Sequence, residues 1–289
     1  MLAACDWILA NKDAYDIRVA NFSLHAASPA SVFFDPLDQA VERLWLNGVV
    51  VVAASGNYAV DGAESGVSFA PGNDPFVITV GASDVNDTLA TSDDTAAPFS
   101  AWGDSPDGLA KPDLVAPGRY LIGPVPAGST LTAERADHVL GGDAMELSGT
   151  SFAAPQVSGA AVMILARHPD WTPDEVKGAL VDTAAALPAA APRSVGAGEL
   201  DIAAARQDAS PSNPNAAVDR FVTPDGTIDT SAWQDAAEAS VAWGDVAWGD
   251  VAWGDVAWSD AAPDGTADAP LVSSSDMSSL EAALGIDSP

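Results

Sequence analysis

Apolar residues gather in short continuous runs along the first two-thirds of the chain, with polar turn residues between them. The run at 49–56 (VVVVAASG) is rich in β-branched residues, a pattern typical of a strand that is buried on both faces of a parallel sheet. Similar apolar runs predict three further strands, at 17–24, 76–83 and 113–118. The first part of the chain therefore supplies the strands of a buried sheet.

Helical patterns alternate with these strands. Near the amino terminus, apolar residues recur at helical spacing and predict an amphipathic helix: Leu2, Cys5, Ile8 and Leu9. Three later segments also predict helices: 35–48, 151–167 and 172–187. Pro36 and Pro173 fit the first turns of two of them, and Gly48 fits the end of the first. Alternation of this kind predicts an α/β fold with a mostly parallel sheet.

The composition changes near residue 208. Residues 209–289 are rich in Ala, Ser, Asp, Gly and Pro, contain one basic residue, Arg220, and predict a disordered acidic tail. Within the tail, VAWGD-type repeats occupy 241–260, with a looser copy, SAWQD, at 231–235. The tail is read either as low-complexity sequence expanded by repeat slippage, or as a multivalent aromatic segment that binds a partner or docks on the folded part.

Charge excludes several classes of partner. The 289 residues contain 11 basic and 41 acidic residues, a net charge of −30, so we expect neither nucleic acid nor an anionic membrane as a partner. The single cysteine, Cys5, cannot form an intrachain disulfide. No signal peptide is visible at the amino terminus, which carries Asp6 within its apolar run, and no apolar stretch is long enough to span a membrane.

Ser151 is the first candidate for chemistry. It stands at the predicted start of a helix, after Gly149 and Thr150, where unpaired N–H groups and the helix dipole favour developing negative charge. The small side chains of Ala153 and Ala154 let a substrate backbone approach this turn closely. Pro155 is expected to lie in the first turn, where no N–H is needed. These features suit a nucleophile beside an oxyanion hole, but an ordinary N-capping serine would explain them as well.

The wider segment SGTSFAAPQVSG (148–159) resembles the nucleophile motif GTSxAxPxVxG of subtilisin-like serine peptidases, the subtilase family, with Gln156 in place of a histidine. The resemblance implies a three-layer subtilisin-like α/β fold. It also identifies Asn57, at the end of VVVVAASGN, as the side-chain donor of the oxyanion hole. In isolation, a Gly-Asn pair would more often be a turn.

The resemblance extends to the substrate-binding walls. VANFSLH (19–25) is similar to the family's substrate-binding strand, so Ser23, Leu24 and His25 are expected to form one wall of the specificity pocket, with His25 replacing a glycine. The expected opposite wall and base are Ala54, Ser55, Gly56 and Phe69. Because glycine lets substrate lie close, His25 is expected to narrow or reorient the pocket.

The resemblance also implies a possible cation loop. In some relatives, carbonyls of the corresponding loop hold a cation, which here suggests Gly72, Asp74 and Val77 as ligands of a structural calcium or monovalent cation. The chemistry itself requires no cofactor. Further landmarks at 70–84, 99–104, 111–118 and 196–205 follow in the family's order, so residues 1–208 are expected to form the C-terminal part of a subtilisin-like peptidase domain.

The family's triad Asp and His precede the substrate-binding strand, and this sequence leaves no room for them before residue 17. None of the three histidines, His25, His138 and His168, has the family's Gly-Thr context. We therefore expect a sheet lacking its N-terminal strands, a truncated chain that is inactive alone, and a missing N-terminal segment of the same peptidase as partner. The full-length protein is expected to be extracellular.

Three functional hypotheses follow. The leading one is a serine endopeptidase that cleaves polypeptide substrates through an acyl-enzyme on Ser151. The second is a non-catalytic peptide-binding or inhibitory module that keeps the groove without the base. The third is the related sedolisin type, whose oxyanion donor is an aspartate, so that Asn57 counts against it.

Overall fold

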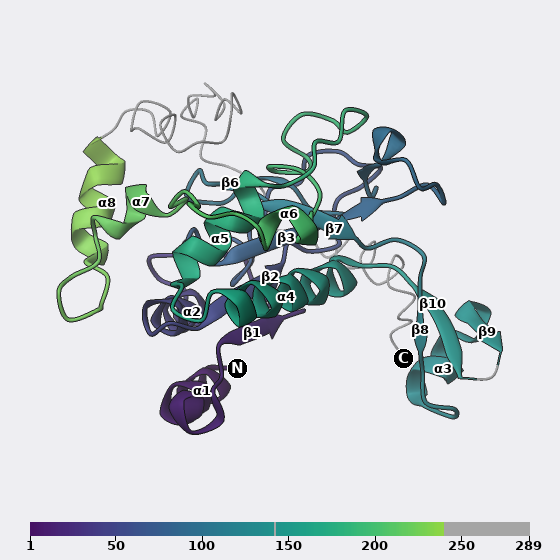
Figure 1. The fold of residues 1–289 in the computed structure, drawn as a ribbon, viewed down its shortest axis with the longest axis horizontal. Helices are drawn as coiled ribbons and strands as arrows, with labels where there is room; N and C mark the ends of the chain where they lie inside the picture. Colours follow the sequence, from purple (N-terminus) through teal and green to yellow (C-terminus); the bar gives the residue numbers. More distant parts are fainter. Residues whose placement is uncertain (142, 240–289) are drawn as a thin grey trace. The chain divides into compact units, whose positions relative to one another are not determined.

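The computed structural model describes residues 1–141 and 143–239. Its central feature is a five-stranded sheet (Figure 1). The strands are β1 (Val19–Phe22), β2 (Val50–Ala54), β3 (Ile78–Asp84), β4 (Thr95–Ala96) and β7 (Leu114–Pro117). Parallel pairs join β1 to β2, β2 to β3 and β3 to β7, whereas β4 pairs antiparallel with β3. The predicted mostly parallel sheet is confirmed, with strands shorter than the apolar runs.

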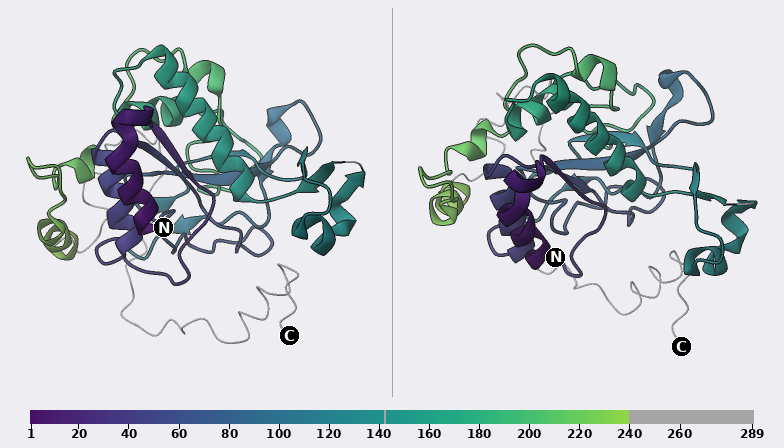
Figure 2. Two further views of the ribbon diagram at one scale, coloured as in Figure 1. Left: turned by 90° about the horizontal axis from the view of Figure 1, so that it is seen from below. Right: turned by 60° about the horizontal axis from the view of Figure 1, so that its bottom comes forward.

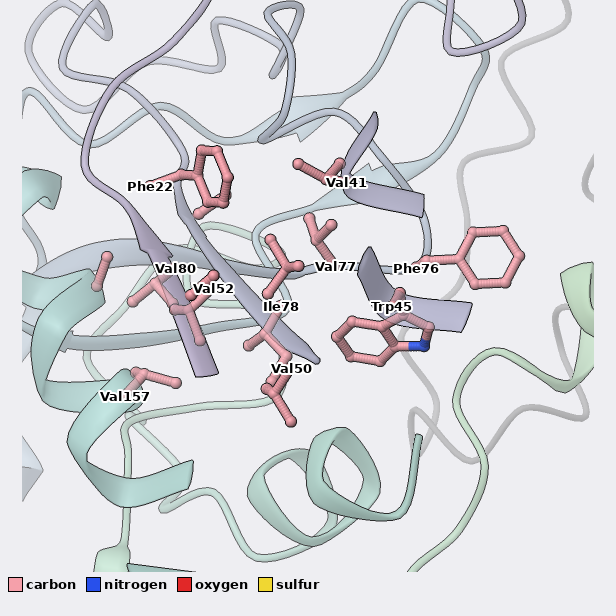
Figure 3. Close-up of a cluster of buried hydrophobic side chains, with 14 of the residues drawn as sticks. Phe22, Val41, Trp45, Val50, Val52, Phe76, Val77, Ile78, Val80 and Val157 are labelled. Atoms are coloured by element: carbon pink, nitrogen blue, oxygen red, sulfur yellow. The ribbon is translucent and has the colours of Figure 1, made fainter. Parts of the chain in front are cut away.

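Helices cover both faces of this sheet. On one face α4 (Thr150–Arg167) contacts β1, β2, β3 and β7, and α5 (Pro173–Asp182) packs beside it. On the other face α2 (Pro36–Leu46) packs on β2, and α1 (Leu2–Tyr15) packs on α2. Figure 3 shows Val41 of α2 and Val157 of α4 on opposite sides of the strand residues. The result is the expected three-layer α/β arrangement.

Local capping explains where two of these helices begin. Asp35 caps α2 by accepting a hydrogen bond from the N–H of Leu37 at 2.7 Å, with Pro36 as the first helical residue. Thr172 and Glu175 form a capping box at the start of α5. That helix ends at Asp182, five residues before the predicted end, because Ala185 pairs instead with Glu199 in a β-bridge.

Smaller elements surround the sheet. A three-stranded antiparallel sheet leads directly into α4 and lies to one side of the central sheet (Figure 2). Its strands are β8 (Leu121–Pro124), β9 (Val139–Gly141) and β10 (Ala144–Leu147), accompanied by α3 (Thr130–Glu134). The remaining short elements are β5 (Gly103–Asp104), β6 (Ala110–Lys111), α6 (Ile202–Ala205) and the 3₁₀ turns Thr91–Asp93 and Ala136–His138.

Packing continues past residue 208, where the acidic tail was expected to begin. Residues 209–239 contain α7 (Ala216–Asp219) and α8 (Thr230–Ala239). Val218 of α7 and Trp233 of α8 belong to the hydrophobic core. The Trp233 ring lies 4.8 Å from that of Phe33 and 6.0 Å from that of Phe221. Burial of these apolar side chains outweighs the acidic composition of 209–239, so the prediction of disorder fails there. The repeats at 241–260 lie outside the described residues.

Candidate active site

Ser151 is the second residue of α4 and is partly buried. The N-cap of the helix is Gly149, which has no side chain to cap this end, and Ser151 lies inside the helix, so the N-capping explanation of Ser151 is wrong. Gly149 has φ +156°, and a Cβ there would lie 3.3 Å from Nδ2 of Asn57. The backbone conformation therefore favours glycine at this position, and a Cβ would make a tight contact with Asn57.

Asn57 follows β2 and faces the start of α4. Its Oδ1 accepts hydrogen bonds from the backbone N–H of Thr150 at 2.8 Å and from Oγ1 of Thr150 at 2.9 Å. Because both bonds hold the oxygen, the amide orientation is fixed and the Nδ2 group is left to donate elsewhere. Asn57 is exposed, and its Nδ2 donates to no described residue. An amide donor and a serine hydroxyl thus share one helix end.

Pro155 lies beyond the first turn of α4, contrary to the prediction, because the helix already begins at Thr150. It has no N–H to donate to the Ser151 carbonyl, which would be its helical partner four residues earlier. The Oγ of Ser23 donates to that carbonyl instead, at 2.9 Å. In return Oγ of Ser151 lies 3.4 Å from the carbonyl oxygen of Ser23. Two hydrogen bonds therefore join the predicted wall residue Ser23 to Ser151.

Two further side chains hold Ser23 in place. Nδ2 of Asn21 donates to Oγ of Ser23 at 2.8 Å, and Oγ of Ser158, two helical turns after Ser151, donates to Oδ1 of Asn21 at 3.0 Å. This chain of hydrogen bonds links β1 to α4 at the site. Asn21 and Ser158 were missed in the sequence, where nothing indicates that they meet.

The two predicted walls lie at the ends of neighbouring strands. The register of β1 and β2 pairs Phe22 with Ala53, so the segments Ser23–His25 and Ala54–Gly56 continue from adjacent strand ends. The predicted base, Phe69, lies beside His25, with ring centroids 4.8 Å apart. The structure adds Tyr58, whose ring centroid is 5.2 Å from that of Phe69. Its position two residues after Gly56 was the signal that sequence reasoning overlooked.

All three histidines of the sequence are described, and none is hydrogen-bonded to Ser151. His25 contacts Phe69, and its Nδ1 lies 2.7 Å from the carbonyl oxygen of Ala26. His138 lies with Arg135, and its Nδ1 is 3.0 Å from the carbonyl oxygen of Glu146. His168 stacks on Trp171 with ring centroids 4.0 Å apart. Each of the three rings is therefore engaged with residues other than Ser151.

The loop suggested as a cation site contains Gly72, Asp74 and Val77. A lysine side chain of the same chain donates hydrogen bonds to its backbone carbonyls. Nζ of Lys177 donates to the carbonyls of Pro75 at 2.6 Å and Val77 at 3.1 Å. It also lies 3.3 Å from a carboxylate oxygen of Asp113.

Two further hydrogen bonds lie within this loop and its neighbouring strand. The Gly72 carbonyl accepts from Oγ1 of Thr79, and Oδ1 of Asp74 accepts from the N–H of Phe76. Burial lowers the pKa of Lys177 to about 8, against the opposing effect of Asp113. Within residues 1–141 and 143–239, no group of three or more Asp, Glu, His or Cys residues could hold a metal ion.

The hydroxyl of Ser151 in the first turn of α4 thus lies at the helix end that the amide of Asn57, after β2, contacts in a three-layer α/β fold. The model of the subtilase family matches residues 3–198 of this sequence. The chain belongs to the subtilase family.

This chain matches only part of the length of individual relatives. The chain is 42% identical to the serine protease AprX of Bacillus subtilis over 142 residues, which are 49% of this chain and 31% of that protein. It is 33% identical to subtilisin amylosacchariticus of Bacillus subtilis subsp. amylosacchariticus over 171 residues, 59% of this chain and 35% of that protein. The chain thus spans about a third of the length of these relatives.

A solved structure of a related protease has a similar fold. The prenylagaramide maturation protease PagA matches with a TM-score of 0.52 and 27% identity, covering 71% of this chain and 65% of that one. In the part of the chain that the structure describes, no helix is both long enough and apolar enough to span a membrane.

Proposed function

We propose that this chain is part of a serine endopeptidase that hydrolyses peptide bonds through an acyl-enzyme on Ser151. The observation that carries the proposal is the double hydrogen bond from Thr150 to Oδ1 of Asn57, which aims the amide at the helix end that holds Ser151. Membership of the subtilase family supports the same reaction.

The proposed reaction uses two donors for the developing oxyanion. Oγ of Ser151 attacks the substrate carbonyl, and the negative charge on its oxygen is stabilised by the N–H of Ser151 and by Nδ2 of Asn57. The N–H of Ser151 has no helical partner because it lies in the first turn of α4, and it donates to no described residue. Collapse of the tetrahedral intermediate expels the amine and leaves the acyl-enzyme, which water hydrolyses.

The general base is the part of the machinery that these residues do not supply. Ser151 needs a group that takes its proton, and the histidines of the sequence are engaged elsewhere. We therefore propose that the base comes from polypeptide outside these 289 residues, namely an N-terminal segment of the same peptidase. Among the described strands, β1 pairs only with β2, so the outer edge of β1 is where such a segment would add.

Labelling with a fluorophosphonate, followed by intact mass spectrometry, tests the proposal. Two proteins are compared: the 289-residue chain, and the chain extended by the in-frame sequence that precedes it in the gene. We expect one adduct on the extended protein, none on its Ser151→Ala variant, and slow or no labelling of the shorter chain. Failure of the extended, folded protein to label would refute peptidase function and favour a peptide-binding module.

The Asn57→Ala variant tests the oxyanion role separately. Loss of one such donor costs about 10²–10³-fold in turnover, a value that comes from subtilisin itself and not from this structure. We expect the extended protein to lose turnover of a peptide substrate by a factor of this order, with a much smaller change in KM. An unchanged turnover would remove Asn57 from the oxyanion hole.

A further inference from the structure

Three aromatic rings lie together where the resemblance predicts the specificity pocket. His25 comes from one wall, Tyr58 follows the opposite wall, and Phe69 is the expected base. Ring centroids lie 4.8 Å apart for His25 and Phe69, 5.2 Å for Tyr58 and Phe69, and 6.2 Å for His25 and Tyr58. Each ring therefore contacts or approaches the other two, and the cluster joins the two walls.

Tyr58 is held at both ends of its side chain. Its ring lies against Gly56, because a Cβ on that glycine would be 2.2 Å from Cε1 of Tyr58. Its hydroxyl donates to the carbonyl of Ser55 at 3.3 Å and accepts from the N–H of Ser68 at 3.1 Å. The ring is thus fixed against the backbone of the wall at Ala54–Gly56. A substrate side chain would have to displace a residue that makes two hydrogen bonds.

His25 is fixed to the opposite wall. Its Nδ1 lies 2.7 Å from the carbonyl oxygen of Ala26, so Nδ1 carries the proton and donates this bond. The imidazole ring then rests on Phe69. Because aromatic contacts of this kind add to the burial of the rings, opening the pocket disrupts packing on both walls at once.

The position of the nucleophile places substrate at this cluster. The reacting carbonyl must lie close to Oγ of Ser151 and to Nδ2 of Asn57. The first of these atoms is 3.4 Å from the carbonyl oxygen of Ser23, and the second belongs to the residue directly after Gly56. The side chain of the substrate residue that contributes this carbonyl therefore enters between the walls, where the three rings lie.

We propose that His25, Tyr58 and Phe69 fill the specificity pocket and restrict the substrate residue before the cleaved bond to glycine or alanine. This inference rests on the proposed peptidase function, because it assumes that peptides bind along Ser23–His25. Larger side chains, such as those of Leu and Phe, meet the rings, and removing the His25 side chain opens the space that they need.

Peptidyl boronic acids provide the test, because boron forms a tetrahedral adduct with a serine hydroxyl. Four compounds that differ only in the terminal residue, Gly, Ala, Leu or Phe, are titrated by isothermal calorimetry into the chain extended by the in-frame sequence that precedes it in the gene. We expect the Ala compound to bind at least about tenfold more tightly than the Leu and Phe compounds, the scale on which pockets discriminate one or more methylenes. In His25→Gly the Leu and Phe compounds should gain about tenfold or more, reversing the order.

Two variants and their controls separate the possible outcomes. Tyr58→Ala should also favour the Leu and Phe compounds, and His25→Gly decides the question if the Tyr58 variant fails to fold. His138→Gly, which changes a histidine outside the pocket, should leave the order unchanged. If Leu and Phe compounds bind the wild-type chain as tightly as Ala, or His25→Gly leaves the order unaltered, the pocket inference is overturned while peptidase function stands. If none of the four binds, the proposed function fails and takes this inference with it.

Discussion

Replacement of Glu42 by glutamine should stabilise the fold at neutral pH and reduce its dependence on pH. Glu42 lies on α2 with Asp38 one turn earlier, and both carboxyl groups face Asp74 in the core. The three residues are 5%, 0% and 0% exposed. Burial, together with the charges of Asp74 and Asp38, raises the pKa of Glu42 to about 10.

The sign and size of the effect follow from proton binding. The folded-state pKa of Glu42 lies above its ordinary value of 4.5, so between these values the folded chain holds a proton that the unfolded chain has lost. The stability from this group is complete below pH 4.5 and is lost as pH rises toward 10. One such proton corresponds to about 1.4 kcal/mol per pH unit. Glutamine is neutral at every pH and removes this contribution.

Urea unfolding at pH 5.5, 6.5 and 7.5 measures the effect as the difference in unfolding free energy between Glu42→Gln and the wild-type chain. That difference should grow in favour of the variant by about 1.4 kcal/mol per pH unit. Asp38 shares the direction of the shift, and its contribution remains in both proteins. Glu134→Gln, on the exposed end of α3, is the matched control and should give a constant difference. Parallel stability curves for Glu42→Gln and the wild type would refute the reasoning.

Three further substitutions test other contacts. Trp233→Ala should lower the unfolding free energy by about 3–5 kcal/mol, because the ring is 1% exposed and packs among Phe33, Phe76 and Phe221. A loss below about 1 kcal/mol in urea unfolding would mean that α8 does not pack there in solution. Lys177→Met should cost about 3–5 kcal/mol in the same assay, because it removes a buried cation from Asp113 and leaves the carbonyl of Pro75 without its donor. Unchanged stability would contradict this. Thr150→Val keeps the backbone N–H that donates to Asn57 but removes the hydroxyl that also donates to it. Loss of about 1.4 kcal/mol of hydrogen bonding should slow fluorophosphonate labelling of the extended protein by about tenfold. An undiminished rate would show that the N–H alone fixes Asn57.

Local patterns predicted the main strands and helices of the central sheet. The β-branched run at 49–56 predicted β2, and Pro36 and Pro173 marked the starts of α2 and α5. These predictions succeed because strand burial and helix capping depend on neighbours within a few residues. The motif around Ser151 identified the family because it combines residues that one helix start requires, and the family match over residues 3–198 confirms it.

Other local predictions failed because contacts between distant segments decide them. The acidic composition of 209–239 predicted disorder, but Trp233 finds a pocket that Phe33 and Phe221 supply. The prediction for Pro155 depended on where α4 begins, and the hydrogen bonds from Thr150 to Asn57, 93 residues away, place that start at Thr150.

The amino-acid sequence thus determined by itself the order of strands and helices, the family, and the serine and asparagine of the candidate site. Only the tertiary structure decided which side chains complete that site and its surroundings. Lys177 meets the carbonyl of Val77 across 100 residues of sequence, and Ser23 meets the Ser151 carbonyl across 128. The rings of His25, Tyr58 and Phe69 gather between two strand ends in the same way. The physical reason is that hydrophobic periodicity fixes which face of an element is buried, whereas the partner on that face is set by how the elements pack.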